Sequence, residues 1–280
     1  MNQNQELALI TGAGKGIGRD LAREFARNGH RLILTSRTPA DLAELAQELD
    51  TDYGIQAQII AQDLNEENAV ENIVQKVQQT GAKIDILVNN AGHGQRGNFW
   101  EIPLEKDLSM IRVNIEAVVR LTKSFLPQML SRGSGRILNT ASVAGFEPGP
   151  SLAIYHATKA FVLSFSEALA TELQETGITV TALCPGPTDT DFFPKADMVD
   201  TNVFQKASVM SPQEVAKTAY TALMKGERVV VPGGMNKALV FSRRFLTEAE
   251  QAKMNEKFYA ENEGPRKRER GDVEYDEKNN

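Results

Sequence analysis

Residues 7–18 read Leu7-Ala-Leu-Ile-Thr-Gly-Ala-Gly-Lys-Gly-Ile-Gly18, an apolar run that passes directly into a loop with glycine at every second position. A helical pattern, Arg19 to Asn28, follows the loop. This order is typical of dinucleotide-binding folds, because glycine lets the backbone turn tightly and approach a pyrophosphate at a helix N-terminus. A purely structural glycine turn is the alternative, since the spacing differs from the plain Gly-x-Gly-x-x-Gly pattern. We predict cofactor contacts at Gly12, Gly14, Lys15, Gly16, Ile17 and Gly18.

The second apolar run, Arg31-Leu-Ile-Leu-Thr-Ser-Arg37, indicates which dinucleotide binds. NAD-dependent folds tend to place an Asp or Glu about 20 residues beyond the glycine loop, where it binds the ribose hydroxyls. This chain has Ser36 and Arg37 there and no carboxylate before Asp41. Arg37 can make paired bonds to a 2′-phosphate, and Lys15 adds a second positive charge. We therefore predict NADP(H), with Ser36 and Arg37 as contacts; the alternative is that both cations are ordinary solvated residues.

Ser142, Tyr155 and Lys159 form a candidate proton-transfer group. Tyr155 and Lys159 are four residues apart in a helical stretch that we predict to continue to about Thr176, so both lie on one helical face. A phenol with a pKa near ~10 is a poor acid–base catalyst at neutral pH, and a neighbouring ammonium is expected to lower that pKa. Ser142 ends an apolar run, and its hydroxyl could hold a carbonyl oxygen. Taken alone, the pair could also be a coincidence on an ordinary helix.

Further motifs follow one another in a fixed order: Asp63-Leu64, Asn89-Asn-Ala-Gly92, Asn114 and Pro185-Gly186. Together with the glycine loop and the Ser142, Tyr155 and Lys159 group, they make the chain resemble the classical short-chain dehydrogenase/reductase family from about Glu6 to Gly233. The resemblance implies a hydride-transfer enzyme whose catalytic residues are Ser142, Tyr155, Lys159 and Asn114. It also implies that Lys159 binds the nicotinamide ribose and that Asn114 holds a water that feeds protons to Lys159.

The predicted cofactor site extends beyond the glycine loop and Arg37. Its further members are Asp63, Leu64, Asn90, Ala91, Gly92, Tyr155, Lys159, Pro185, Gly186 and Thr188. Asp63 could accept a hydrogen bond from the adenine amine, or it could instead cap a helix that begins near Asn65. Asn90 lies where buried amides also brace loops, so its motif serves structure and cofactor together. Asn114 could have only a local backbone role.

Seven apolar runs alternate with helical patterns along the 280 residues. They lie at Leu7, Leu32, Ile59, Ile84, Ile137, Val180 and Val229. Because the runs are nearly continuous, we expect strands covered on both faces and therefore an α/β fold with a doubly wound, parallel, seven-stranded sheet of Rossmann type. Ligands of such sheets bind beyond the carboxyl ends of the strands. The predicted strand ends are followed by the glycine loop, Asp63, Asn90, Ser142 and Pro185, which indicates one shared site.

We expect residues 1–233 to form one domain that binds the dinucleotide and carries the catalytic group. Residues 234–263 place apolar side chains among many charges and are predicted to extend the same domain with one or two amphipathic helices. This extension could cover the substrate pocket, dock against a partner subunit or lie on a membrane; Arg243-Arg244 beside Phe241 and Phe245 keeps the membrane alternative open. Residues 264–280 are predicted to be a disordered charged tail.

The composition excludes several classes of function. The net charge of −6 gives no support for nucleic-acid binding. Cys184 is the only cysteine, so an internal disulfide and a cysteine-rich metal site are excluded, and we predict no metal because no His, Asp and Glu cluster has suitable spacing. We find no signal peptide and no apolar stretch of about 18 residues, so the expected location is cytoplasmic and membrane binding is not favoured.

Substrate contacts are expected from three irregular segments, residues 93–100, 143–153 and 187–210, the last of which could form a mobile lid. Phe146, Phe192 and Phe193 could make an apolar wall for an acyl or ring substrate, or they could be ordinary packing beneath a loop. His93 and His156 are expected to be loop or supporting residues, although histidine titrates near neutrality.

The predicted function is an NADP-dependent oxidoreductase that interconverts a carbonyl and a secondary alcohol with Tyr155 as the acid–base group. A 3-oxoacyl thioester, a small ketone and a sugar are all open as substrates, since one fold hosts many activities. The alternative is a redox sensor that binds the dinucleotide without chemistry; the complete set of four catalytic residue types favours the enzyme. From the resemblance we also expect a homodimer or homotetramer, paired through helices at residues 114–130 and 155–176.

Overall fold

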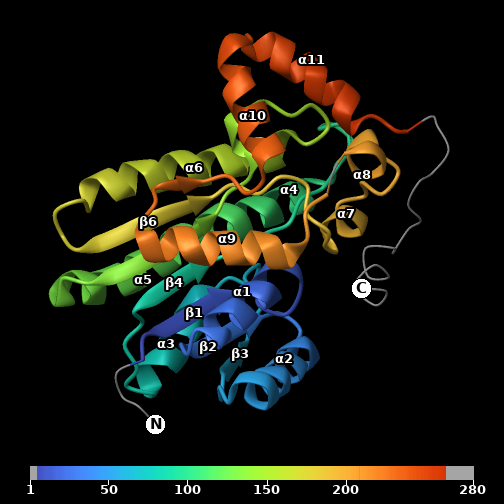
Figure 1. Ribbon diagram of the computed structural model, residues 1–280. Helices are drawn as coiled ribbons and strands as arrows, with labels where there is room; N and C mark the ends of the chain where they lie inside the picture. The colour runs from blue at the N-terminus through green and yellow to red at the C-terminus, as the bar shows by residue number, and fades with distance from the viewer. Residues whose placement is uncertain (1–4, 208, 263–280) are drawn as a thin grey trace.

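The computed structural model describes residues 5–207 and 209–262 and contains the predicted sheet. The strands are β1 (Leu7–Thr11), β2 (Arg31–Ser36), β3 (Gln58–Ala61), β4 (Ile86–Asn89), β5 (Gly135–Thr140), β6 (Ile178–Leu183) and β7 (Val229–Val230). They lie in the order β3-β2-β1-β4-β5-β6-β7, and each neighbouring pair is parallel (Figure 1). The prediction of a doubly wound, parallel, seven-stranded α/β sheet is confirmed.

The central strands are apolar throughout because both of their faces are covered. In β1, Ala8 and Ile10 belong to one hydrophobic core, whereas Leu7 and Leu9 belong to a second core on the opposite face. Side chains alternate between the faces of a strand, so a strand between two cores needs apolar residues at consecutive positions. All five residues of β1 are buried as a result.

Helices form a layer on each face of the sheet (Figure 1). The helices are α1 (Gly16–Arg27), α2 (Pro39–Tyr53), α3 (Ala69–Gln79), α4 (Leu104–Ile111), α5 (Ala117–Arg132), α6 (Ala153–Glu172), α7 (Phe192–Lys195), α8 (Asn202–Lys206), α9 (Pro212–Lys225), α10 (Gly234–Ser242) and α11 (Glu248–Tyr259). Helices α1, α2 and α9 pack against the first core, and α3, α5 and α6 pack against the second. Among the helices of the described residues, none combines the length and the apolar character that crossing a bilayer requires.

The direction in which the sheet grows reverses at β1. The chain continues from β1 to β2 and β3 on one side, and it returns to place β4 on the other side of β1. Ligands of open parallel sheets bind at such a switch point, beyond the carboxyl ends of the strands. The glycine loop follows β1 and residues 90–92 follow β4, so both lie at this switch point.

Residues 234–262 form α10, a 3₁₀ turn at Arg243–Phe245 and α11. Thr247 caps α11: its hydroxyl accepts from the backbone N–H of Glu250, and the Glu250 carboxylate accepts from the backbone N–H of Thr247. In Figure 1, α10 and α11 lie together at one end of the molecule, and α11 contacts α8. Helix α6 ends at Glu172, before the predicted end near Thr176, and a turn that includes Gly177 (φ 75°) leads into β6. The tail predicted at residues 264–280 lies outside the described residues.

Candidate active site

The glycine loop between β1 and α1 packs closely against the loop that follows β4. Gly12 has a left-handed backbone (φ 66°), and a β-carbon there would lie 2.9 Å from Ala91 Cα. A β-carbon on Gly18 would lie 2.1 Å from the carbonyl oxygen of Gly12. Only glycine fits these two positions without moving backbone. These two glycines therefore have a structural role: they allow the start of α1 to pack closely against the end of β4.

The same loop meets β2 and the segment after β6. A β-carbon on Gly14 would lie 3.0 Å from Ser36 Oγ, and one on Gly16 (φ 53°) would lie 2.9 Å from Thr190 Cγ2. Gly14 and Ser36 are thus neighbours, as a shared ligand site requires. Ile17, in contrast, packs against the core formed with α1, α2 and α9 and contributes stability at this position.

Thr11 and Asn90 tie the glycine loop to the end of β4. The Thr11 hydroxyl accepts hydrogen bonds from the backbone N–H groups of Asn90 and Ala91, at 2.9 and 3.0 Å. The Asn90 side chain donates to the carbonyl of Thr11 at 3.0 Å and accepts from Thr140 Oγ1 at 3.3 Å. The Asn90 side chain is therefore a brace between β1, β4 and β5.

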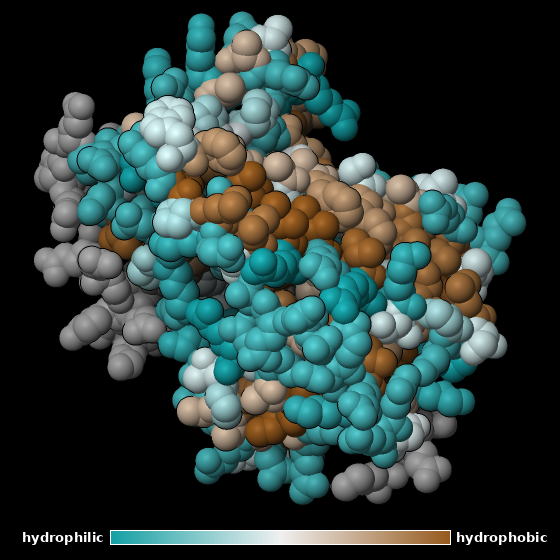
Figure 2. Space-filling view, turned by 180° about the vertical axis from the view of Figure 1, so that it is seen from behind, coloured by the Kyte–Doolittle hydropathy of each residue, from teal (hydrophilic) through white to brown (hydrophobic). Residues whose placement is uncertain are grey.

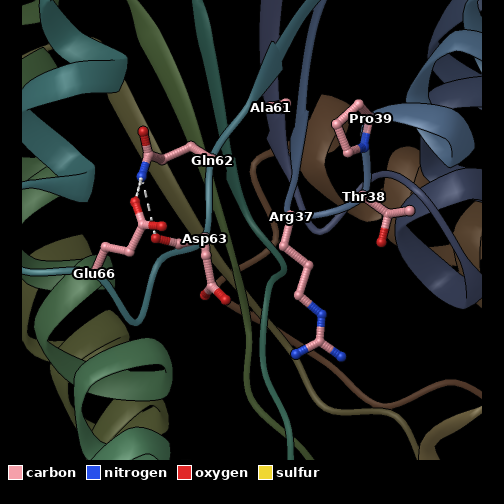
Figure 3. A pocket seen from close by; sticks show the side chains of 7 residues that line it. All are labelled: Arg37, Thr38, Pro39, Ala61, Gln62, Asp63 and Glu66. Atoms are coloured by element: carbon pink, nitrogen blue, oxygen red, sulfur yellow. Dashed lines mark hydrogen bonds between the residues drawn. The ribbon is translucent and has the colours of Figure 1, made fainter.

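A pocket of about 510 Å³ lies at the carboxyl ends of β2 and β3. It is lined by Arg37, Thr38, Pro39, Ala61, Gln62, Asp63 and Glu66. In Figure 3 the side chains of Arg37 and Asp63 extend from neighbouring strands toward the same opening. Arg37 is exposed, and within residues 5–207 and 209–262 its side chain forms no hydrogen bond or ion pair. The pocket thus contains the guanidinium of Arg37, which has no side-chain partner within the described residues, and the carboxylate of Asp63.

Three other polar residues of this pocket, Gln62, Asp63 and Glu66, make local hydrogen bonds. Gln62 Nε2 donates to the Glu66 carboxylate, and Asp63 Oδ1 accepts from the backbone N–H of Asn65 at 2.9 Å. Asp63 therefore shapes a turn while it lines the pocket, but it does not cap a helix near Asn65, because α3 begins only at Ala69 with Asn68 as its N-cap. Leu64 points elsewhere: it packs against the core of α3, α5 and α6 and lines a second pocket of about 580 Å³.

Lys15, the second cation expected near a 2′-phosphate, forms an ion pair with Asp191 at 3.5 Å. Asp191 also pairs with Lys195 at 2.7 Å. Lys15 therefore connects the glycine loop to α7, and it is not gathered with Arg37 among the residues that line the first pocket.

Ser142 and Tyr155 come together between the end of β5 and the first turn of α6. Ser142 is buried; its hydroxyl accepts from the backbone N–H of Ala144 at 3.1 Å and donates to the carbonyl of Pro185 at 3.4 Å. Burial raises the pKa of Tyr155 to about 12, although a hydrogen bond with Ser142 opposes this shift. Tyr155 is therefore a protonated phenol at neutral pH, next to a serine hydroxyl.

Lys159 is buried one turn further along α6. Its ammonium donates to the carbonyl of Thr140 at 2.8 Å and lies 5.8 Å from the centroid of the Tyr155 ring. Burial lowers the pKa of Lys159 to about 8. The sequence predicted that Lys159 lowers the pKa of Tyr155, but the shift at Tyr155 has the opposite direction. The reason is that desolvation dominates at the phenol, while Thr140 holds the ammonium.

Asn114 lies in a π-helical turn, Arg112–Glu116, that joins α4 to α5. Such turns are often found at functional sites. Asn114 Nδ2 donates to the carbonyl of His93 at 2.9 Å and to Thr158 Oγ1 at 3.0 Å, and Oδ1 accepts from the backbone N–H of His93 at 3.1 Å. Asn114 therefore does have the local backbone role, since it holds the loop after β4.

Gly92 brings Asn114 and Lys159 close to each other. A β-carbon on Gly92 would lie 3.2 Å from Asn114 Oδ1 and 3.3 Å from Lys159 Nζ. The Asn114 and Lys159 side chains therefore meet beside Gly92. Asn114 thus lies next to the group formed by Ser142, Tyr155 and Lys159.

The chain after β6 closes the site from another side. The Pro185 carbonyl accepts from the backbone N–H of Val143 at 3.0 Å, and a β-carbon on Gly186 would lie 2.4 Å from the Asn236 side chain. Thr188 is buried and donates its hydroxyl to the carbonyl of Gly186 at 2.9 Å. These predicted cofactor contacts lie beside Ser142 and beneath α10, and the Thr188 side chain stabilises the turn.

Phe192 covers Tyr155 at the expected substrate side. Their ring centroids are 5.1 Å apart, and Gly94 lies against both rings, because a β-carbon there would be 2.8 Å from Phe192 Cζ. Phe193 is only 3% exposed and packs on Phe204, so it belongs to a core and not to a wall. Phe146 packs against a different cluster. Of the three predicted wall residues, Phe192 is the one whose ring pairs with that of Tyr155.

The two histidines named from the sequence act as supporting residues. His93 Nε2 hydrogen-bonds with Ser109 Oγ at 3.0 Å, and burial lowers its pKa. His156 is buried, with Nδ1 at 2.9 Å from the Glu147 carbonyl and Nε2 at 3.1 Å from the Tyr259 hydroxyl. Burial lowers the pKa of His156 to about 4, so it is neutral at pH 7.

This burial of His156 predicts a loss of stability in mild acid. The unfolded chain protonates this residue below its ordinary pKa of 6.5, whereas the folded chain does so only below about 4. Between these values the unfolded state holds more protons, so the free energy of unfolding falls as pH falls, by about 1.4 kcal/mol per pH unit for one group. Urea unfolding at pH 6.5 and about pH 5 should show a weaker pH dependence for His156→Gln than for the wild type. Equal slopes would contradict this assignment.

Sequence reasoning missed several residues that hold the site together. Thr11 and Thr140 end two predicted strands, and Thr158 lies between Tyr155 and Lys159. These positions next to predicted site residues could have identified all three threonines. Tyr259 gave no such signal, because its partner His156 is distant in the sequence.

Comparisons with known proteins agree with this geometry. The chain matches the model of the short chain dehydrogenase family over residues 6–199. An uncharacterized oxidoreductase of Staphylococcus epidermidis is 32% identical over 227 residues, which cover 81% of this chain and 94% of that protein.

Two solved structures are similar over most of their length. A short-chain dehydrogenase from Sphingobium yanoikuyae in complex with NADPH has a TM-score of 0.77 and 34% identity, and the match covers 86% of this chain and 94% of that one. The bulky-bulky ketone specific alcohol dehydrogenase from Comamonas testosteroni has a TM-score of 0.73 and 30% identity, over 87% and 93% of the two chains.

The fold and the site define an α/β protein of the dinucleotide-binding class. The chain belongs to the short-chain dehydrogenase family, a family of oxidoreductases that bind a nicotinamide dinucleotide.

Proposed function

We propose that this protein is an NADP-dependent oxidoreductase that interconverts a carbonyl and a secondary alcohol. One observation carries the proposal: Ser142, Tyr155 and Lys159 gather beside Asn114 at the carboxyl ends of the central strands, next to the glycine loop. A protonated phenol, a serine hydroxyl and a buried amine together can hold a carbonyl oxygen and deliver a proton to it.

The residues around the switch point fit a phosphorylated dinucleotide. The glycine loop offers backbone N–H groups at the start of α1, and a 2′-phosphate suits Arg37 because its guanidinium has no partner within the described residues. Asp63 lines the same pocket and would face the adenine side. When bound, the cofactor supplies the hydride that reduces the carbonyl carbon. The NADPH complex of the Sphingobium relative supports the phosphorylated form.

The protein's own residues supply and replace the proton. Ser142 orients the substrate oxygen, and Tyr155, which stays protonated because its pKa is raised to about 12, donates to that oxygen as charge develops on it. Lys159 titrates nearest to neutrality, with a pKa of about 8, so it can return a proton to Tyr155. Asn114 lies beside Lys159 across Gly92 and would hold the water that reprotonates the amine.

The surroundings of Tyr155 favour a carbonyl with apolar substituents. Phe192 lies on the phenol ring, and a buried cluster that includes Leu152 and Met198 continues behind it. A 3-oxoacyl thioester and a bulky ketone both fit such a surface better than a sugar, whose hydroxyls would need polar partners. The ketone specificity named for the Comamonas relative supports the second of these.

We further propose that subunits pair through the face formed by α4, α5 and α6. Figure 2 shows hydrophobic residues gathered on the side of the molecule opposite to the view of Figure 1, where this layer lies. Exposed apolar side chains on these helices are Leu104, Ile111, Leu130 and Phe161. An apolar patch of this kind is typical of a protein interface, so a homodimer or homotetramer is expected.

The test of the proposed function is the loss of NADPH absorbance across a panel of carbonyls that includes 3-oxoacyl thioesters, bulky ketones and sugars, with NADH in parallel. We expect turnover that prefers NADPH and is highest for an apolar ketone or 3-oxoacyl substrate. NADPH binding without turnover on any carbonyl would contradict the proposal and favour a redox sensor instead.

A further inference from the structure

A cluster of buried polar side chains joins the extension of residues 234–262 to the segment between Ser142 and Tyr155. Its members are Glu147, His156, Arg243, Asn255 and Tyr259. Glu147 follows the 3₁₀ turn Val143–Phe146 that Ser142 caps, and His156 directly follows Tyr155. The cluster therefore contacts the chain one 3₁₀ turn beyond Ser142 and directly beyond Tyr155.

The first link in the cluster is His156. Its Nδ1 donates to the carbonyl of Glu147 at 2.9 Å, so Nε2 is the acceptor and the Tyr259 hydroxyl donates to it at 3.1 Å. Burial raises the pKa of Tyr259 above its ordinary value, so its hydroxyl stays a donor. Gly149 packs closely against the imidazole, since a β-carbon on Gly149 would be 2.1 Å from His156 Cδ2. The ring is thus held from three sides.

The second link is an ion pair between Glu147 and Arg243, 2.5 Å apart, with side chains only 3% and 8% exposed. Asn255 donates to the carbonyl of Pro148 at 2.8 Å, which fixes the next residue of the same turn. A buried carboxylate is costly without its cation, so this turn keeps its conformation only while the extension is docked.

Tyr259 also contacts a second wall of the substrate region. Its backbone carbonyl accepts from Arg96 Nε at 2.9 Å, and Arg96 in turn donates its backbone N–H to Ala196, at the end of α7. The Tyr259 ring packs at 5.4 Å from the His156 ring, which packs at 6.0 Å from the Tyr155 ring. Tyr259, in the last turn of α11, therefore contacts both Arg96 and His156, the neighbours of Ala196 and Tyr155.

We propose that Tyr259 is a positioning residue: with Arg243 and Asn255, it docks α11 onto residues 147–156 and thereby fixes Tyr155 relative to Ser142 for substrate binding. The proposal rests on the proposed function. It assigns to the C-terminal extension the role of completing the substrate site, in place of the membrane role that the sequence left open. The Tyr259 hydroxyl does not touch the reacting atoms, and its effect passes through His156.

The test is Tyr259→Phe, which removes one hydroxyl and keeps the ring. We expect kcat/KM for the carbonyl to fall about tenfold, because a buried imidazole nitrogen loses its donor and Tyr155 loses its fixed position, while the Kd for NADPH stays within about twofold. Tyr220→Phe is the matched control. Tyr220 OH lies 2.9 Å from His30 Nε2, an equivalent pair at α9, away from residues 147–156.

Amide hydrogen exchange tests the positioning role of Tyr259 without depending on turnover, and therefore separately from the proposed enzymatic activity. Amide hydrogen exchange in residues 143–156 should accelerate in Tyr259→Phe and stay unchanged in Tyr220→Phe. Wild-type turnover on any carbonyl tests the function alone. If Tyr259→Phe matches Tyr220→Phe in both kcat/KM and exchange, the positioning role is overturned. If Tyr259→Phe does not fold, Asn255→Ala must show the same two changes, and its failure to do so overturns the proposal equally.

Discussion

Tyr155→Phe should lower kcat for carbonyl reduction by about 10²–10⁴-fold, the range expected when a positioned general acid is removed. The variant keeps the aromatic ring and therefore the contact with Phe192 at 5.1 Å, so the fold and the covering of the site are preserved. What it loses is the phenol proton, which the raised pKa of Tyr155 keeps in place at neutral pH. The Kd for NADPH should change little, because the pocket at Arg37 follows β2 and lies away from Tyr155, which is near the end of β5.

The measurement is single-turnover reduction of the best carbonyl, with NADPH binding followed separately by fluorescence. Tyr220→Phe again serves as the control for loss of a phenol hydroxyl elsewhere in the fold. A near-normal kcat in Tyr155→Phe would remove Tyr155 from the mechanism.

Arg37→Glu should reverse the cofactor preference. Arg37 faces the pocket of about 510 Å³ and has no protein partner within the described residues, so its charge is available to a 2′-phosphate. Replacing it by a carboxylate removes the paired hydrogen bonds and adds repulsion to a pocket that already contains Asp63 and Glu66. We expect KM for NADPH to rise about 10²–10³-fold, with KM for NADH unchanged or lower.

Arg31→Glu is the matched control, because Arg31 is an exposed arginine at the opposite end of the same strand, β2. It should leave the ratio of the two KM values at the wild-type level. If that ratio is also unchanged in Arg37→Glu, Arg37 does not bind the 2′-phosphate and the choice of NADP loses its main support.

The central strands could be predicted because neighbours bury both of their faces, so each needs a continuous apolar run. The edge strand β3 is mostly exposed, and its signal was only the short run Ile59-Ile60-Ala61. Even β7, which has only two residues, was visible because Val229 and Val230 follow α9 and precede a proline and glycine turn. The strand ends could then be located, and parallel strands bring their carboxyl ends to one edge. For that reason the glycine loop, Asp63 and Ser142 could be predicted to share a site.

The parts that the sequence did not reveal depend on contacts between distant segments. Glu147 and Arg243 form a buried ion pair, but neither has a local pattern that marks it, and Arg243 suggested a membrane surface instead. Phe192 and Phe193 are adjacent and chemically identical, yet one covers Tyr155 and the other fills a core. The pKa of Tyr155 was predicted in the wrong direction, because spacing shows which charges are near and not how strongly burial removes water.

Transfer of hydride from NADPH to a carbonyl is the activity that we propose for this protein. The most direct measurement uses NADPH deuterated at C4 in either configuration, with the best carbonyl of the panel, and determines the mass of the alcohol produced. We expect one of the two labelled cofactors to yield an alcohol with deuterium on the carbinol carbon. An alcohol without deuterium from both labelled cofactors, or NADPH binding that never yields an alcohol, would contradict it.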